Sequence, residues 1–109
     1  MSLYADYVRE ISTDSIIETP EGFATYRYLS DKTVYIVDIF VKPEFRHKHY
    51  ATELADCIIK EANEKGCIEV LGTVHPQSKT ADVSLKAQMA YGFKLHSISN
   101  GAIILRKDI

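Results

Sequence analysis

The 109-residue sequence has no tryptophan, no long apolar run and no excess of charge of one sign. Its 13 basic and 15 acidic side chains give a formal net charge of −2, and the basic residues are scattered, so nucleic acid is not an expected partner. No segment has the length of a membrane span and no signal peptide is visible, so a membrane is not expected either. We therefore expect a cytoplasmic protein.

Cysteine is also scarce, and nothing in the sequence has the spacing of a metal site. Cys57 falls in an apolar helical pattern and Cys67 at the start of an apolar strand, so both are expected to be small buried hydrophobes in a reducing cytosol. The histidines do not pair with cysteines, and no metal is expected. With 46% hydrophobic residues, the chain should form a single domain over residues 1–109.

The most informative segment, residues 34–65, predicts a strand, a basic loop and a helix. Residues 34–41 are almost all apolar, which is typical of a strand covered on both faces. Pro43 ends that strand, because proline has no N–H for a ladder. From Tyr50, apolar residues recur at helical spacing up to Lys65, and Gly66 follows as a left-handed cap.

The basic loop, residues 46–49 (Arg-His-Lys-His), thus precedes a helix N-terminus, where unpaired N–H groups and the positive end of the helix dipole meet. This arrangement suits a phosphate or pyrophosphate. The plain alternative is that every strand–loop–helix unit has a helix N-terminus, and most bind nothing.

The remaining elements predict an α+β fold with a mixed, mostly antiparallel sheet and flanking helices, in the order α-β-β-β-α-β-α-β-β. Periodicity favours helices over residues 3–11 and 78–91. Strands are expected over residues 15–18, 23–29, 68–74, 93–98 and 102–106. A turn over residues 19–22 and the Asn100-Gly101 pair predict hairpins. The strand–helix–strand order around residues 50–65 implies a right-handed parallel crossover.

Two motifs resemble the GNAT superfamily of N-acetyltransferases. Residues 41–51 (VKPEFRHKHYA) are similar to its acetyl-CoA loop, whose core is Gln/Arg-x-x-Gly-x-Gly/Ala. Arg46 matches the first core position and Ala51 the last, whereas His49 replaces the first core glycine and His47 another common glycine. Residues 84–93, ending in Gly92-Phe93, are similar to a second family segment at the expected separation.

The resemblance implies an acetyl-CoA-dependent N-acetyltransferase, in which an amine acceptor attacks the thioester directly in a ternary complex. It implies a gap between the central strand and the next one, where the backbone of Ile39, Phe40 and Val41 would meet the acetyl-pantetheine arm. The pyrophosphate would be surrounded by Arg46, His47, Lys48, His49, Tyr50 and Ala51.

Asp38 is the first candidate for the catalytic base, because it is one polar residue in an apolar strand and burial would make it a stronger base. The alternative is a structural ion pair with Arg27 or Lys94. His75, at the end of the next strand, is the second candidate, or else part of an exposed His-Pro turn. Gln88 stands where many family members have a tyrosine acid, and it cannot protonate a thiolate.

Those departures leave an alternative function, a GNAT-fold binding or interaction module with weak or lost catalysis. A third alternative is a domain that uses the basic loop for another phosphate ligand. The chain before Ser15 has room for one short helix, so the acceptor side should be open, completed by a partner chain or shaped for a large substrate. The terminal hairpin should leave an edge strand through which a homodimer could form.

Overall fold

A computed structural model of the chain describes residues 3–4 and 14–109. The elements are β1 (Ser15–Thr19), β2 (Gly22–Tyr28), β3 (Thr33–Val41), the 3-10 turn η1 (Pro43–Phe45), α2 (Tyr50–Glu64), β4 (Glu69–Val74), α3 (Ala81–Tyr91), β5 (Lys94–Ser99) and β6 (Ala102–Asp108). The predicted order is confirmed from the first strand onward. Leu3 and Tyr4 are helical, and the rest of the predicted first helix lies outside the described residues.

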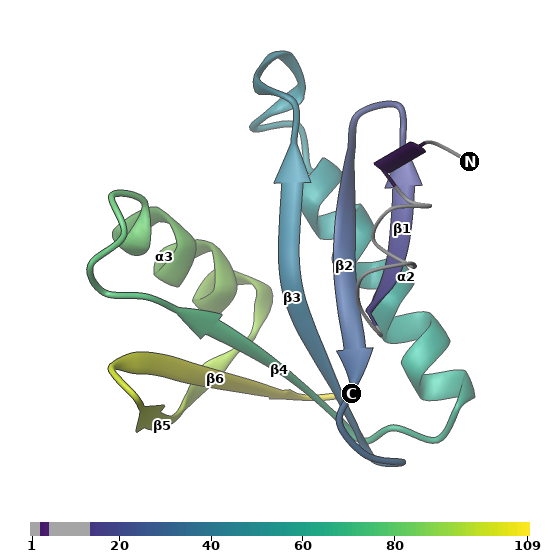
Figure 1. The fold of residues 1–109 in the computed structure, drawn as a ribbon, viewed down its shortest axis with the longest axis vertical. Coiled ribbons are helices and arrows are strands. Elements are labelled where there is room, and N and C mark those ends of the chain that lie inside the picture. Colours follow the sequence, from purple (N-terminus) through teal and green to yellow (C-terminus); the bar gives the residue numbers. More distant parts are fainter. Residues whose placement is uncertain (1–2, 5–13) are drawn as a thin grey trace.

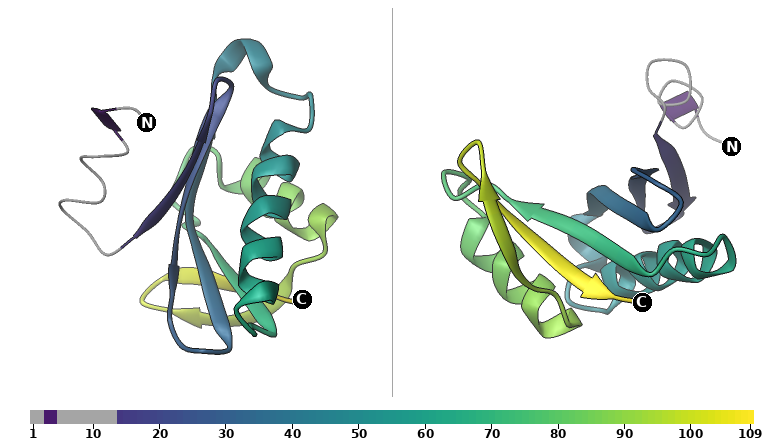
Figure 2. Two further views of the ribbon diagram at one scale, coloured as in Figure 1. Left: turned by 90° about the vertical axis from the view of Figure 1, so that its right-hand side faces the viewer. Right: turned by 90° about the horizontal axis from the view of Figure 1, so that it is seen from below.

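The six strands form one mixed sheet in the order β1-β2-β3-β4-β6-β5. All neighbouring strands are antiparallel except β3 and β4, which run parallel on either side of the α2 crossover. This confirms the predicted fold class and the parallel crossover. Within the described part of the chain, α2 and α3 both lie on one face of the sheet (Figure 2), which we call the helical face; we call the other the open face.

Strands β3 and β4 form a V. Their parallel ladder covers only Thr33–Tyr35 against Glu69–Leu71. Beyond it, β3 continues to Val41 and β4 to Val74, and the two strands diverge towards their C-terminal ends (Figure 1). The backbone of β3 therefore has one edge without a strand partner in the upper half of the V.

A bulge in β3 decides which side chains reach each face. Thr25 of β2 lies opposite Asp38, but its neighbour Tyr26 lies opposite Ile36, so Val37 has no partner. Such a bulge bends a strand and increases its local twist. Asp38 and Phe40 are exposed on the open face, so the prediction of a strand covered on both faces is wrong for this half of β3.

The core lies between the sheet and the helices. Helix α2 buries one stripe at helical spacing: Leu54, Ala55, Ile58 and Ala62. The fully buried strand residues opposite include Val34, Val70 and Leu105. Cys67 is buried as predicted, but Cys57 is exposed because it falls outside the stripe of α2, so that prediction is wrong.

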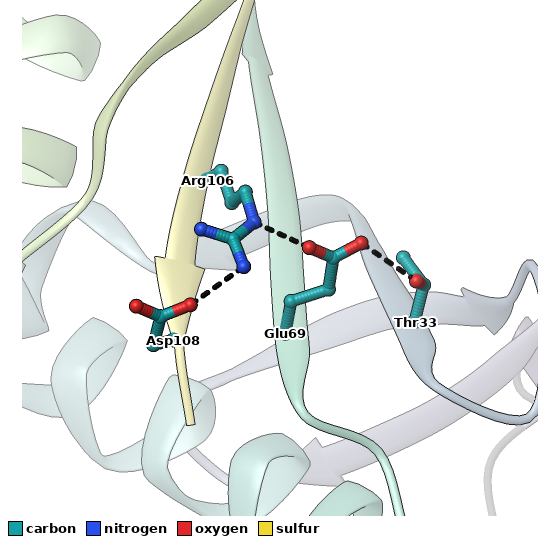
Figure 3. A network of polar contacts seen from close by, with 4 residues as sticks. All are labelled: Thr33, Glu69, Arg106 and Asp108. Atoms are coloured by element: carbon teal, nitrogen blue, oxygen red, sulfur yellow. Dashed lines mark hydrogen bonds and ion pairs between the residues drawn. The ribbon is translucent and has the colours of Figure 1, made fainter.

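A polar network ties β3, β4 and β6 together at the closed end of the V (Figure 3). One oxygen of the Glu69 carboxylate accepts a hydrogen bond from the Thr33 hydroxyl at 2.8 Å, and the other accepts one from Arg106. Arg106 also contacts Asp108 at 2.6 Å. The hydrogen bonds from Arg106 and Thr33 lower the pKa of Glu69. The network therefore links β3, β4 and β6 at the level of the parallel ladder between β3 and β4.

A second polar contact joins α2 to the sheet. The Tyr28 hydroxyl donates a 2.5 Å hydrogen bond to Glu61 Oε2. Burial alone would raise the pKa of Glu61, but the hydrogen bonds from Tyr28 and Tyr26 outweigh it and the pKa is lowered. This contact fixes the last turns of α2 on β2.

Candidate functional site

The loop between β3 and α2 has an unusual backbone. His47 has φ 64° and His49 has φ 67°, so both histidines lie in the left-handed region. Only glycine adopts that region without a steric cost, although histidine occurs there more often than most side chains. The two histidines thus have the backbone conformation that glycine favours, at the two positions where the resembled motif has glycine.

The Arg46 side chain turns back onto the end of β3. Its Nε donates to the Val41 carbonyl oxygen at 3.0 Å, and its guanidinium lies 5.7 Å from the centre of the Phe40 ring. A cation at that distance is attracted by the ring. Arg46 therefore holds the loop against the strand, in addition to any contact with a ligand.

The N-terminus of α2 is open. His49 is the N-cap residue and makes no side-chain capping bond, and the first helical hydrogen bond is from Glu53 N to His49 O at 3.0 Å. The N–H groups of Tyr50, Ala51 and Thr52 precede that bond and are the orphan donors of the helix. Lys48 is exposed beside them. Orphan donors, the helix dipole and cationic side chains together favour an anion.

The free edge of β3 leads to this helix end. Ile39, Phe40 and Val41 are paired with β2 on one edge and have no partner in β4 on the other. Gly22 allows β2 to approach closely here, because a Cβ on it would lie 2.1 Å from the Phe40 carbonyl oxygen. The close contact with β2 on the opposite edge therefore fixes the position of the unpaired edge of β3.

The two candidate bases flank the mouth of the V. Asp38 is exposed on β3, so its predicted burial is wrong; the bulge and the one-sided helical cover explain why. Arg27 forms its ion pair with Asp14, at 2.6 Å, and Asp38 has no ion pair within residues 3–4 and 14–109. His75 is exposed directly after β4, in a turn closed by a 2.9 Å hydrogen bond from Ser78 N to His75 O.

Sequence reasoning missed two contacts inside the V. The Tyr35 hydroxyl lies 3.0 Å from Thr73 Oγ1, bridging the strands just above their ladder. Gln88 Nε2 donates to the Thr73 carbonyl oxygen at 3.0 Å and to Ser84 Oγ at 3.2 Å. Gln88 Oε1 is buried with no partner among the described residues. Gln88 therefore anchors α3 on β4. No sequence spacing could have predicted the contacts of Thr73 with Tyr35 and Gln88, because they join separate elements.

Comparison with known protein families identifies the chain. Residues 7–85 match the model of the acetyltransferase (GNAT) family. The chain belongs to the GNAT family. That match spans β1 to the first half of α3, and so includes the V, the loop with its two left-handed histidines and the open end of α2. Comparison with curated protein sequences gives no significant match.

Solved structures share the GNAT fold at low sequence identity. The PaiA N-acetyltransferase of Thermoplasma acidophilum, in complex with coenzyme A, has a TM-score of 0.73 at 24% identity. The match covers 82% of this chain and 54% of that one, so the chain spans about half the length of that relative. A GNAT acetyltransferase of Elizabethkingia anophelis with acetyl-CoA bound has a TM-score of 0.76 at 16% identity, over 95% of this chain and 82% of that one. The IAA acetyltransferase of Bacillus cereus has a TM-score of 0.73 at 18% identity, over 98% and 89% of the two chains.

Residues 3–4 and 14–109 also lack two other features. No helix among them is long and apolar enough to cross a bilayer. No group of three or more histidine, cysteine, aspartate or glutamate side chains among them could hold a metal ion.

Proposed function

We propose that the chain is an acetyl-CoA-dependent N-acetyltransferase that acts on an amine by direct attack in a ternary complex. The observation that carries the proposal is the continuity of two features. The unpaired edge of β3 runs directly into a loop and helix N-terminus with free donors and cationic side chains. A ligand with an amide-containing arm and a pyrophosphate fits that pair of features.

The residues divide between the two parts of such a ligand. The N–H groups at the start of α2, with Tyr50 and Ala51, would surround the pyrophosphate together with the loop. There the exposed Arg46 and Lys48 add positive charge, and the exposed imidazoles of His47 and His49 lie beside them. The backbone of Ile39, Phe40 and Val41 offers ladder hydrogen bonds to the pantetheine arm. Bound there, acetyl-CoA would supply the thioester carbonyl that accepts the amine nitrogen.

Asp38 is the first candidate for the group that accepts the proton of the amine. The amine loses a proton as its nitrogen forms the new C–N bond and the C–S bond breaks, and Asp38 takes that proton directly or through water. His75, on the other side of the V, is the second candidate. Gln88 is held by Thr73 and Ser84 and offers no acidic proton, so the CoA thiolate leaves without a side-chain acid.

The acceptor should approach over the open face. Phe40 is 41% exposed there, stacks on Phe23 with 5.5 Å between ring centres, and lies two residues from Asp38 on the same strand. An amine next to an apolar or aromatic group would place that group on Phe40 and its nitrogen near Asp38. A cytoplasmic location would supply both acetyl-CoA and the reducing conditions that suit two free cysteines.

The test is release of CoA thiol in the presence of a panel of amines. Asp38→Asn should lower kcat at least tenfold, because general-base catalysis contributes about 10²–10⁴-fold. The matched control is Asp31→Asn, in the β2–β3 turn at the other end of β3, which should leave kcat unchanged. Turnover that is equal in both variants would remove Asp38 from the mechanism. Absence of both binding and turnover of acetyl-CoA would overturn the proposal.

A GNAT-fold module that binds without catalysis is the second candidate, favoured by the two histidines in place of glycine and by Gln88. It predicts acetyl-CoA binding without turnover. His49→Gly separates a blocked site from a working one: a large gain in affinity would show that the imidazole obstructs the pyrophosphate, and a large loss would show that it is a ligand.

A further inference from the structure

The charge around the basic loop, residues 46–49, is balanced when its histidines are neutral. The segments on either side of the loop carry exposed carboxylates, Glu44 in η1 and Glu53 in the first turn of α2. The β1–β2 turn is adjacent too, because the Lys42 N–H donates to the Glu21 carbonyl oxygen at 2.8 Å. The formal charges of these basic and acidic side chains cancel: Lys42, Arg46, Lys48, Glu21, Glu44 and Glu53. A pyrophosphate site here therefore has no net side-chain charge until a histidine is protonated.

The two histidines of the loop lie where an anion would bind. His49 is the N-cap residue of α2, and its exposed side chain makes no capping hydrogen bond. Its left-handed backbone precedes the right-handed turn at Tyr50, and such a pair directs successive N–H groups toward one point, an arrangement that binds anions. His47, also left-handed and exposed, precedes His49 by two residues. Both imidazoles can therefore turn toward a pyrophosphate at the start of α2.

We propose that His47 and His49 take up protons when acetyl-CoA binds, so that their imidazolium groups supply the net positive charge that faces the pyrophosphate. This inference rests on the proposed acetyl-CoA site. Imidazole is the side chain whose charge ordinarily changes between about pH 5 and 8, and an adjacent anion favours its charged form. The coupling is reciprocal, because a ligand that favours protonation is itself favoured by protonation. The affinity for acetyl-CoA should therefore rise as the pH falls.

Stability does not account for histidine at these two positions. Glycine adopts the left-handed region without a steric cost, and neither imidazole is buried, so neither adds packing to the core. An imidazole does offer a charge that depends on pH, which the permanently charged guanidinium of Arg46 does not. Proton uptake thus gives the loop a high affinity for acetyl-CoA at acid pH and an easier release of CoA at alkaline pH.

The test is a calorimetric titration with acetyl-CoA at about pH 6 and about pH 8, which span the ordinary titration of histidine. The double variant His47→Asn/His49→Asn removes both titrating groups, and asparagine tolerates the left-handed region better than most side chains. The two proteins should bind similarly at the higher pH, whereas the wild type should bind at least tenfold more tightly at the lower pH. The reason is that one pair of unit charges about 4 Å apart in water changes an equilibrium constant about fivefold.

Proton uptake can also be measured directly. Titrations at about pH 7, within the range in which imidazole changes charge, are repeated in two buffers that differ in ionisation enthalpy. The difference in binding enthalpy between the buffers gives the number of protons taken up with the ligand. That number should be larger for the wild type than for the double variant. Equal uptake by the two proteins would overturn the inference.

The matched control is His96→Asn, an exposed histidine of β5 outside the loop, which should bind as the wild type does at both pH values. The 3′-phosphate of CoA also changes charge near about pH 6, but it does so with every protein, so the comparison isolates the loop histidines. Circular dichroism at both pH values checks folding. The same pH dependence in wild type and double variant would overturn this inference and leave the proposed cosubstrate in place. No binding to any of the proteins at either pH would overturn both.

Discussion

Replacing either left-handed histidine with glycine should stabilise the protein. The structure places His47 at φ 64° and His49 at φ 67°, in the loop between β3 and α2. Both side chains are exposed and neither makes a capping bond to α2, so substitution removes little except the steric cost of the backbone conformation. Lys48, between them, has no positive φ and is the matched control.

The magnitude follows from two opposing contributions. An L-residue in the left-handed region costs roughly 1–2 kcal/mol, and histidine, which occurs there more often than most, belongs at the low end. Glycine in turn costs about 0.5–1 kcal/mol, because it loses more backbone freedom on folding. His47→Gly or His49→Gly should therefore raise the free energy of unfolding by up to about 0.5 kcal/mol. Lys48→Gly should lower the free energy of unfolding by about 0.5–1 kcal/mol, because Lys48 has no positive φ whose steric cost glycine could remove.

Urea unfolding followed by circular dichroism measures the difference. With an m value of about 1.5–2 kcal/mol/M for a protein of this size, each histidine variant should raise the midpoint by up to about 0.3 M. Lys48→Gly should lower its midpoint by a similar amount. The opposite signs at adjacent positions are the decisive feature. If all three variants lost stability equally, the loop would not have the conformation described here.

Three other substitutions test the supports of the V. Gly22→Ala should cost about 2 kcal/mol in urea unfolding, because its Cβ would meet the backbone of β3, whereas Gly72→Ala should cost less, since its Cβ would meet the end of the Gln88 side chain and no backbone atom. Glu69→Gln should flatten the loss of thermal stability at acid pH. The lowered pKa of Glu69 gives stability that is present above its unfolded value and is lost as the pH falls through the folded one; a variant as acid-sensitive as wild type would contradict this. Tyr28→Phe should cost about 1–2 kcal/mol in urea unfolding, because it removes the hydrogen bond to Glu61; an unchanged midpoint would show that this bond is not formed.

Much of the fold was predictable because the turn-forming residues and the spacing of apolar residues indicate the same helices and strands. The apolar stripe of α2 and the Asn100-Gly101 turn are features that sequence patterns report directly. The loop was also predictable, since its residues match a family motif around Arg46 and Ala51. The glycine positions of that motif even mark the two histidines that adopt the left-handed backbone.

The environment of individual side chains was less predictable. Asp38 was expected to be buried, because its strand is apolar on nearly every residue. The bulge at Val37 and the presence of α2 on one face only bring it to the surface instead, and neither can be read from an apolar run. Contacts such as Tyr35 with Thr73 depend on the angle between two strands, which is set by tertiary packing.

The most direct test of the proposed acetyl-CoA site is a calorimetric titration with acetyl-CoA of the wild type, Ala51→Asp and Ala87→Asp. Ala51 lies at the start of α2 and Ala87 near the middle of α3. Both side chains are exposed, so both variants should fold. An aspartate at position 51 would set a negative charge among the orphan donors of α2, which suits the helix but repels a pyrophosphate. We predict micromolar binding to the wild type and Ala87→Asp, and at least tenfold weaker binding to Ala51→Asp. No binding to the wild type at millimolar acetyl-CoA, or equal binding to all three proteins, would contradict the proposed site.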